Sequence, residues 1–442
     1  MPLELLVRTC NHFFPDFNRW LWRIPDHRNQ ERITYSVPEL IWEESLMFLC
    51  GVGSRNAMVG DSSRVGFHAT LCGLAGVESD AAPHPDTPYT FLQVLNPSHL
   101  IGLQRKMTRR LFRMRCFDQF RFGNEWLVAV DATWLRTYDR KHCERCLTQK
   151  QADGSIRYMH AVLEAKLILA NGMAISLGSV PIENADSKKK RGKDKWKQDC
   201  ELKAFPRLAQ KLKKAFPRLP ICLVMDSLYA CKPVMELCAE MNWSYIAVLK
   251  ETRTSKLWEK AVTKAARQDA FIQTQEDGTV QTFRWATNLE HGGQTTHAVF
   301  CDEVDTDSEE HHWAWITDHR PDQRTTPIIA NQGGRRRWKI ENEGFNEQKN
   351  GEIELKHDYG SKKNAWYNDY LVVQVVHTLI QLMQFGDLVK KLSNGIHDSF
   401  SAAFKTLRAF VVQLRESVQR DRLAPALAAH PPERIRVRFD TS

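Results

Sequence analysis

The stretch that decides the fold is WLVAVDATWL, residues 126–135, an apolar run with branched side chains and a single carboxylate, Asp131. A short apolar run rich in such residues predicts a strand that is buried on both faces. Two further apolar runs follow at 158–170 and 173–182, and the Asn-Gly dipeptide between them predicts a tight β-hairpin. These three segments predict the first part of a β-sheet.

Helices and strands alternate after the hairpin. Residues 201–219 have helical spacing and predict a helix interrupted near Pro206, whereas 219–230 predict a strand that ends at Asp226. A second helix and another strand are predicted within 232–250. This alternation predicts a mixed α/β sheet.

The rest of the chain flanks or interrupts that sheet. Helical spacing predicts helices at 38–52 and 87–114, and a length of 442 residues suits two to three domains. We divide the chain into five segments: a helical, partly basic N-terminal region (1–120), the first part of the sheet core (121–251), a β-rich insertion of short alternating strands (252–320), the completion of the core with a further helix (321–390), and a C-terminal helix with a basic tail (391–442).

The composition is that of a globular protein, with 42% hydrophobic and 26% charged residues. A net charge of +9 favours a polyanionic partner without requiring one. The apolar segment 371–383 is interrupted by glutamines and a histidine, so it predicts a buried helix and no membrane span. Eleven scattered cysteines and no secretory signal predict reduced thiols in the cytoplasm.

Three carboxylates are candidates for a metal site. Asp131 and Asp226 each end a predicted strand, and ligands of open α/β sheets gather at the carboxyl ends of strands. The segment GGRRRWKIENEGFNEQK, 333–349, predicts a helix that carries Glu341 and, less favoured as a ligand, Glu343. Oxygen ligands of this kind suit Mg²⁺ or Mn²⁺. The plainer alternatives are turn-forming aspartates and a solvated amphipathic helix.

The same segment offers cations for a phosphate. Arg337 precedes Glu341 by one turn and can clamp a phosphate with two hydrogen bonds. Arg335, Arg336 and Lys349 add further positive charge. Carboxylates, divalent ions and arginines together predict phosphodiester chemistry assisted by two metal ions.

These motifs resemble the DDE triad of bacterial insertion-sequence transposases. The likeness rests on Asp131 in VAVDATWL, Asp226 in VMDSLYA and Glu341 in RRRWKIENEGF, and it is closest to the group with a β-strand insertion before the Glu. The third motif of that family is Tyr, two residues, Arg, three residues, Glu, six residues, Lys. Arg337 and Glu341 match it, whereas Gly334 stands at the Tyr position and Lys349 comes one residue late.

The resemblance implies a ribonuclease-H-like mixed sheet that cuts DNA at transposon ends and joins the 3′ ends to a target. It implies Mg²⁺ or Mn²⁺ as cofactor, DNA ends and target DNA as partners, DNA-end binding by residues 1–120, a homodimer when assembled, and a bacterial, nucleoid-associated location. The alternatives are a metal-dependent nuclease on the same core that joins no strands, and a domesticated DNA-binding protein without catalysis.

The resemblance also implies aromatic contacts to DNA. A Trp of the β insertion is expected to hold a flipped base, with Trp285, Trp313 and Trp315 as candidates, and Tyr229 is expected near DNA. Each could instead be a packing residue.

Two features stand apart from the triad. His142, Cys143, Cys146 and His160 predict a zinc site between the first two strands, with reduced structural thiols as the alternative. The basic run KKKRGKDKWK, 188–197, predicts a loop that is solvated or touches DNA phosphates without reading sequence.

Overall fold

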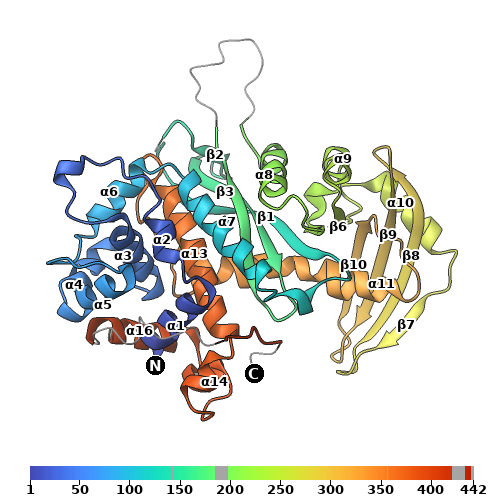
Figure 1. Cartoon of the computed structure of the whole chain (residues 1–442). Coiled ribbons are helices and arrows are strands. Elements are labelled where there is room, and N and C mark those ends of the chain that lie inside the picture. The colour runs from blue at the N-terminus through green and yellow to red at the C-terminus, as the bar shows by residue number, and fades with distance from the viewer. Residues whose placement is uncertain (142, 185–197, 356, 421–433, 440–442) are drawn as a thin grey trace, which may run out of the picture. The chain divides into compact units, whose positions relative to one another are not determined.

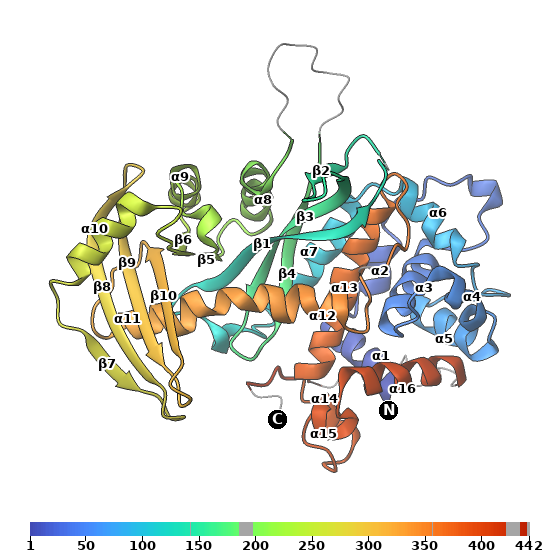
Figure 2. The same cartoon turned by 180° about the vertical axis from the view of Figure 1, so that it is seen from behind.

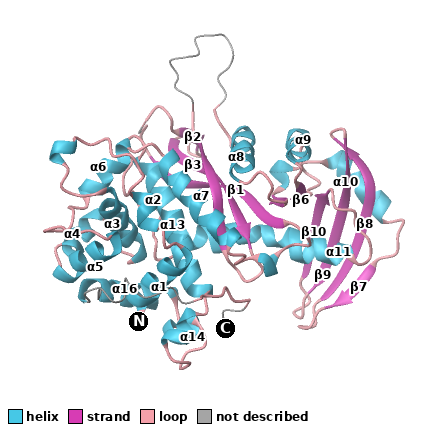
Figure 3. Ribbon diagram, in the orientation of Figure 1, coloured by secondary structure: helices cyan, strands magenta, loops and turns pink. Residues whose placement is uncertain are grey.

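The protein is a mixed α/β protein with a ten-stranded mixed sheet and helical N- and C-terminal regions (Figure 3). The computed structural model describes residues 1–141, 143–184, 198–355, 357–420 and 434–439 (Figure 1). The basic run 188–197 therefore lies outside the described residues. The chain forms two compact units: a helical unit (1–119, 175–177 and 344–442) and a sheet unit (120–174 and 178–343).

The helical unit combines helices from both ends of the chain. They are α1 (Pro2–Phe13), α2 (Phe17–Leu21), η1 (Gln30–Arg32), α3 (Val37–Leu49), α4 (Arg55–Ser62), α5 (Val65–Ala75), α6 (Asp86–Val94), α7 (Ser98–Arg113), α12 (Glu347–Asn350), α13 (Ala365–Phe385), α14 (Leu388–Leu392), α15 (Phe400–Phe404) and α16 (Leu407–Arg420). The predicted helix at 38–52 is confirmed as α3. The segment 87–114 forms two helices, because the chain is extended at Leu95, just before Asn96-Pro97.

Helix α13 is the centre of the helical unit. It is buried from Ala365 to Met383 and packs against α1, α3, α6 and α7, which confirms the buried helix predicted at 371–383. Arg55 of α4 bridges α3 and α13: its guanidinium is ion-paired with Glu44 of α3 at 2.7 Å and with Asp369 of α13 at 3.5 Å. None of the described helices is long and apolar enough to cross a membrane.

The ten strands form one sheet in the order β2-β3-β1-β5-β6-β10-β9-β8-β7, with β4 paired to β3. They are β1 (Trp126–Tyr138), β2 (Leu147–Lys150), β3 (Ile156–Ile168), β4 (Ala174–Ile182), β5 (Ile221–Met225), β6 (Ser244–Val248), β7 (Phe271–Thr274), β8 (Val280–His291), β9 (Gln294–Val304) and β10 (Glu310–Thr317). The predicted hairpin is confirmed: the turn between β3 and β4 has Gly172 at φ 100°, a backbone conformation that glycine adopts without strain.

The centre of the sheet is parallel. β1 pairs with β5, and β5 pairs with β6, all in the same direction, whereas β3 runs antiparallel to β1. The crossovers are made by α8 (Glu201–Ala215) and α9 (Lys232–Met241). The predicted break at Pro206 is wrong, because α8 runs through it and buries one apolar face made of Phe205, Leu208 and Leu212.

Residues 252–320 extend this same sheet. β10 pairs antiparallel with β6, and β9, β8 and β7 follow in antiparallel order. A helix that the sequence reading missed, α10 (Ser255–Ala265), packs against β8 (Figure 2). The insertion is therefore hydrogen-bonded to the parallel strands through β6 and β10.

Candidate functional site

Asp131 and Asp226 occupy equivalent positions on neighbouring parallel strands. The β1–β5 pairing runs from Trp126 and Ile221 to Ala129 and Val224, and each aspartate follows its last paired residue by two. Side chains two residues apart on an extended chain share a face. The register therefore places Asp131 of β1 and Asp226, the extended residue just after β5, at matching positions on one face of the parallel pair. The prediction that Asp131 ends its strand is wrong in one respect, since β1 continues to Tyr138 alongside β3.

Backbone N–H groups hold both carboxylates. Asp131 Oδ1 accepts from the N–H of Ala132 at 2.8 Å. Asp226 Oδ1 accepts from the N–H of Leu228 at 2.6 Å and caps the short 3₁₀ turn η4 (Ser227–Tyr229). Asp226 thus has the turn-forming role that was considered for it. The hydrogen bond that caps the turn also fixes the orientation of its carboxylate.

Arg337 is the cation of this site. Its Nη1 lies 3.4 Å from Asp131 Oδ2, its side chain is buried, and its guanidinium lies 4.2 Å from the centre of the Trp338 ring. Burial raises the pKa of Asp131 to about 6, against the opposing effect of Arg337. The negative charges of Glu201 and Asp226 raise this pKa further, so the carboxylates share one electrostatic environment.

Glu201, the first residue of α8, is a site residue that sequence reasoning missed. Its pKa is raised, mainly by burial and also by the negative charge of Asp226. A hydrogen bond from Tyr229 opposes this rise. Tyr229 itself is fully buried, donates its hydroxyl to Glu201 Oε2 at 3.1 Å, and packs edge-on against Phe205. Tyr229 therefore positions Glu201, and its ring is buried in this structure, as in the packing alternative. No motif around Glu201 marks it, because its approach depends on where α8 packs.

Among the described residues, no hydrogen bond or ion pair joins Glu341 to either aspartate, and the same is true of Glu201. Glu341 is exposed in the π-helical turn η7 (Ile340–Asn346), and within the described residues its carboxylate has no hydrogen bond or ion pair. Three groups of potential ligands have all their atoms within 4.8 Å of one another in the described part of the chain, and none contains Asp131, Asp226 or Glu341. The alternative ligand Glu343 is ion-paired with Lys339 at 2.8 Å.

The buried Glu164 is another carboxylate near this position. It pairs directly opposite Asp131 on the antiparallel strand β3 and has no exposed surface. Directly opposite residues of an antiparallel pair lie on one face of the sheet. The sequence reading overlooked Glu164 because the strand that carries it is otherwise apolar.

Two glycines let the arginine segment lie directly on the sheet. A Cβ at Gly334 would stand 2.3 Å from Nε1 of Trp315, and one at Gly333 would stand 2.4 Å from Cδ1 of Ile246. These glycines join the π-helical turn η5 (Ile328–Gly333) to the 3₁₀ helix η6 (Gly334–Trp338). Because β10 fills the space, the Tyr of the family pattern has no room at position 334.

The other predicted cations are distributed differently. Arg335 is ion-paired with Glu303 and lies 4.0 Å above the ring of Trp313. Arg336 is half-buried, and burial lowers its pKa. Lys349 belongs to α12 of the helical unit, so the structure gives no relation between it and the carboxylates.

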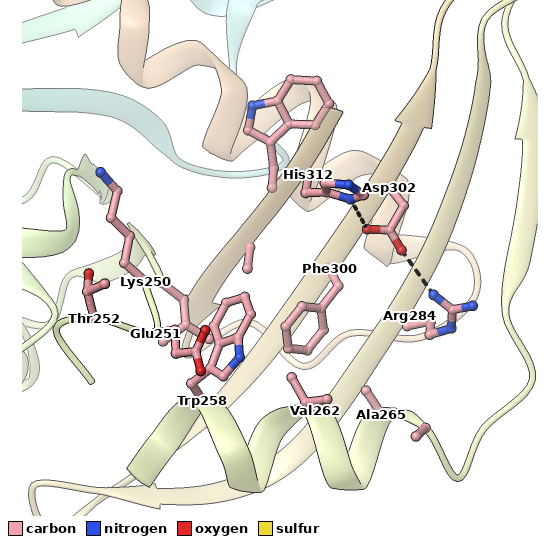
Figure 4. A pocket seen from close by; sticks show the side chains of 14 residues that line it. Lys250, Glu251, Thr252, Trp258, Val262, Ala265, Arg284, Phe300, Asp302 and His312 are labelled. Atoms are coloured by element: carbon pink, nitrogen blue, oxygen red, sulfur yellow. Dashed lines mark hydrogen bonds and ion pairs between the residues drawn. The ribbon is translucent and has the colours of Figure 1, made fainter. Parts of the chain in front are cut away.

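A cavity of about 850 Å³ lies in the insertion between α10 and the sheet (Figure 4). Among the predicted tryptophans, Trp313 lines it, Trp315 is buried in the core, and Trp285 is not part of its lining. Its aromatic lining includes two residues that were not predicted, Trp258 and Phe300, whose rings meet edge-on at 5.7 Å. Its polar side holds a chain of contacts from Arg284 to Asp302 at 3.0 Å and from Asp302 to His312 at 2.8 Å.

The predicted cysteine pair is assembled with His160. Cys143, Cys146 and His160 have ligand atoms within 4.8 Å of one another, whereas His142 lies outside the described residues.

The carboxylates of Asp131, Asp226 and Glu201 offer oxygen donors of the kind that a hard divalent cation takes, and the charges of Asp226 and Glu201 act on the pKa of Asp131. Like Glu341, none of the three belongs to a group of ligand atoms that all lie within 4.8 Å of one another in the described part of the chain. No protein-family model matches the chain, and no curated protein matches it either. The functional argument therefore rests on the geometry of the site.

Proposed function

We propose that this protein is a DDE transposase, which cuts DNA at the ends of a mobile element and transfers the 3′ ends into target DNA. The observation that carries the proposal is the in-register pair of Asp131 and Asp226 on adjacent parallel strands, with the buried Arg337 beside it. A ribonuclease-H-like core is part of the proposal, and the mixed sheet with its central parallel strands supports it.

The metal ligands are Asp131 and Asp226, with a third carboxylate from Glu201 or Glu341. A bound Mg²⁺ or Mn²⁺ would activate an attacking oxygen and stabilise the leaving oxygen of a phosphodiester. Arg337 can donate to a phosphate oxygen, because its guanidinium has five donors and the contact with Asp131, at 3.4 Å, is long. Tyr229 holds Glu201 toward the aspartates through its hydroxyl.

The aromatic cavity of the insertion is the proposed place for an extruded base. Trp313 and Trp258 offer ring faces, and Lys250 and Arg284 lie in the same lining and can meet a phosphate. Arg335, which lies over Trp313, is two residues from Arg337 on the same 3₁₀ helix. Helix η6 thus contacts both the tryptophan of the cavity and the aspartate of the metal site.

DNA binding by the helical unit is supported by α7. Arg105, Arg109 and Arg113 recur every four residues and so lie along one face of this helix. Burial and the charges of the neighbouring arginines 105 and 113 lower the pKa of Arg109, which reflects repulsion among the like charges of this face. A DNA backbone on this face would relieve that repulsion. A homodimer is expected in the assembled complex, because two ends must be cut together.

The test is cleavage of a labelled linear duplex made from the DNA that flanks the protein's own coding region, with Mg²⁺ or Mn²⁺. The wild type is compared with Asp131→Ala, Asp226→Ala, Glu341→Ala and Glu201→Gln. Metal-dependent cutting that is lost in both aspartate variants supports the metal site, and the response of the other two variants identifies the third ligand.

Joining is measured by adding a circular target plasmid. Transfer of the labelled 3′ end into the plasmid supports transposition. Cutting without joining would instead support a metal-dependent nuclease on the same core. Binding of the duplex without cutting in either metal would refute the catalytic proposal and favour a DNA-binding protein.

A further inference from the structure

Cys143, Cys146 and His160 form a cluster that the proposed DNA chemistry does not use. The two cysteines lie in the turn before β2, where the N–H of Cys146 donates to the carbonyl of Cys143 at 3.4 Å. His160 lies on β3, and the pairing of Leu147 with Met159 brings Cys146 next to it. Two separate elements therefore supply the three side chains.

The sulfur–nitrogen distances within the cluster match a zinc-bound set, and the two sulfurs lie about half an ångström closer together than they would around the ion. The two sulfurs are 3.3 Å apart, and His160 Nε2 lies 3.7 Å from the sulfur of Cys143 and 3.8 Å from that of Cys146. Around a tetrahedral zinc ion, bond lengths of 2.3 and 2.0–2.1 Å place two sulfurs about 3.8 Å apart and a sulfur and a nitrogen about 3.6 Å apart. A disulfide is excluded, because its sulfurs would be about 2.05 Å apart.

We propose that Cys143, Cys146 and His160 bind a structural zinc ion. Both cysteines and the histidine are ligand types that zinc prefers, and Cys146 and His160 are buried, as in a site that excludes solvent from most of its coordination sphere. The fourth position is filled by water or by another donor. The site is independent of the proposed transposase activity, since none of its three residues belongs to the carboxylate site.

Hydrogen bonds tie the turn that would hold the zinc ion to chain segments on both sides of residues 185–197. Asn184 donates its backbone N–H to the carbonyl of Arg145 at 3.1 Å and its side-chain amide to that of Cys146 at 2.7 Å. The N–H of Asp199 then donates to the side-chain oxygen of Asn184 at 3.2 Å, two residues before Glu201. Loss of the metal would therefore loosen the turn and the start of α8 together.

The test is the metal content of the full chain, purified from zinc-supplied cells without a chelator and without a metal-binding tag. We expect about one zinc per chain by mass spectrometry of the metal, and a fall of more than about tenfold in Cys143→Ser and in Cys146→Ser. Cys116→Ser is the matched control, since Cys116 is also half-buried but lies outside the cluster in the helical unit. It should keep its zinc.

Two further measurements use only the wild type, so they test the zinc site even if the cysteine variants fail to fold. Co²⁺ added to the metal-free protein should give the visible absorption of a tetrahedral cobalt thiolate, and zinc should protect Cys143, which is half-exposed, from alkylation. Absence of zinc together with absence of the cobalt absorption would overturn the proposal, as would full zinc content in Cys143→Ser. DNA cleavage plays no part in these measurements, so this proposal and the transposase proposal can fail separately.

Discussion

Replacing Asp131 by Asn should stabilise the metal-free protein at neutral pH. The pKa of Asp131 in the folded protein is about 6, against about 3.9 for an aspartate in an unfolded chain. Folding therefore favours the protonated carboxyl. The wild type loses stability as the pH rises from about 4 to 6, and above that range the ionised carboxylate costs about 3 kcal/mol. Asparagine has the shape of the carboxyl group and never ionises.

The contribution of the ionised carboxylate to stability can be separated from the other effects of the substitution by measuring at two pH values. The difference in unfolding free energy between Asp131→Asn and the wild type should grow by about 1 kcal/mol between pH 5 and pH 8. Packing changes and the altered contact with Arg337 add a constant at all pH values, provided that the arginine stays charged. The growth of the difference with pH therefore reports the carboxyl group alone.

The assay is urea unfolding in the presence of a chelator, read by pulsed hydrogen exchange of peptides from β1. Strand β1 is part of the sheet unit, so exchange of its peptides reports the unfolding of that unit and is not changed by separate unfolding of the helical unit. Asp226→Asn is measured in parallel as the variant of the partner carboxylate. A difference that stays constant from pH 5 to pH 8, or one that shrinks as the pH rises, would refute the reasoning about burial of Asp131.

Three further substitutions test the surroundings of the site. Gly334→Ala should destabilise the protein by about 2 kcal/mol in urea unfolding, because its Cβ would stand 2.3 Å from Trp315 Nε1. Tyr229→Phe removes the hydrogen bond that lowers the pKa of Glu201, so the acid limb of the pH profile of the proposed DNA cleavage should move to higher pH. Arg337→Lys keeps the charge but loses the two-pronged donor, and cleavage should slow by about tenfold to a hundredfold at unchanged DNA affinity.

Matched controls accompany these three variants. Gly60→Ala has open space around its Cβ and should leave stability unchanged or slightly higher. Tyr245→Phe removes a hydroxyl that bonds Thr296, away from the carboxylates, and should leave the pH profile in place. Arg218→Lys changes an exposed arginine near the opposite end of β5 and should leave cleavage unchanged. A glycine variant as stable as its control, a pH profile unmoved by Tyr229→Phe, or full cleavage by Arg337→Lys would each contradict the corresponding argument.

The sequence predicts the strands of this fold better than it predicts the site. The run around Asp131 and the Asn-Gly hairpin are local signals, because apolar periodicity and a turn dipeptide act within a few residues. The alignment of Asp131 with Asp226 follows from strand order, which the alternation of helices and strands indicates. The resemblance in the arginine segment directed attention to Arg337, and the structure brings this residue to Asp131.

The third carboxylate could not be predicted in the same way. Glu201 approaches the aspartates because α8 packs onto the sheet with its first turn at that edge, and no local pattern encodes this packing. Glu341 follows Arg337 on the chain, but a change from 3₁₀ to π-helical geometry lies between them. Sequence spacing assumes one regular helix, so it could not show which way the Glu341 carboxylate faces.

The shared register of β1 and β5 limits how the sequence of this chain can diverge during evolution. The distance between the two aspartates is set by a ladder of four paired residues, and not by the long stretch of chain that connects them. The loops within that stretch can gain or lose residues, whereas one residue inserted between Ala129 and Asp131 would turn the carboxylate to the opposite side of the sheet. Divergent lineages should therefore differ in the length of the connection and agree in the ladder, so a distant relative is better recognised by the position of each aspartate on its strand than by the interval between them.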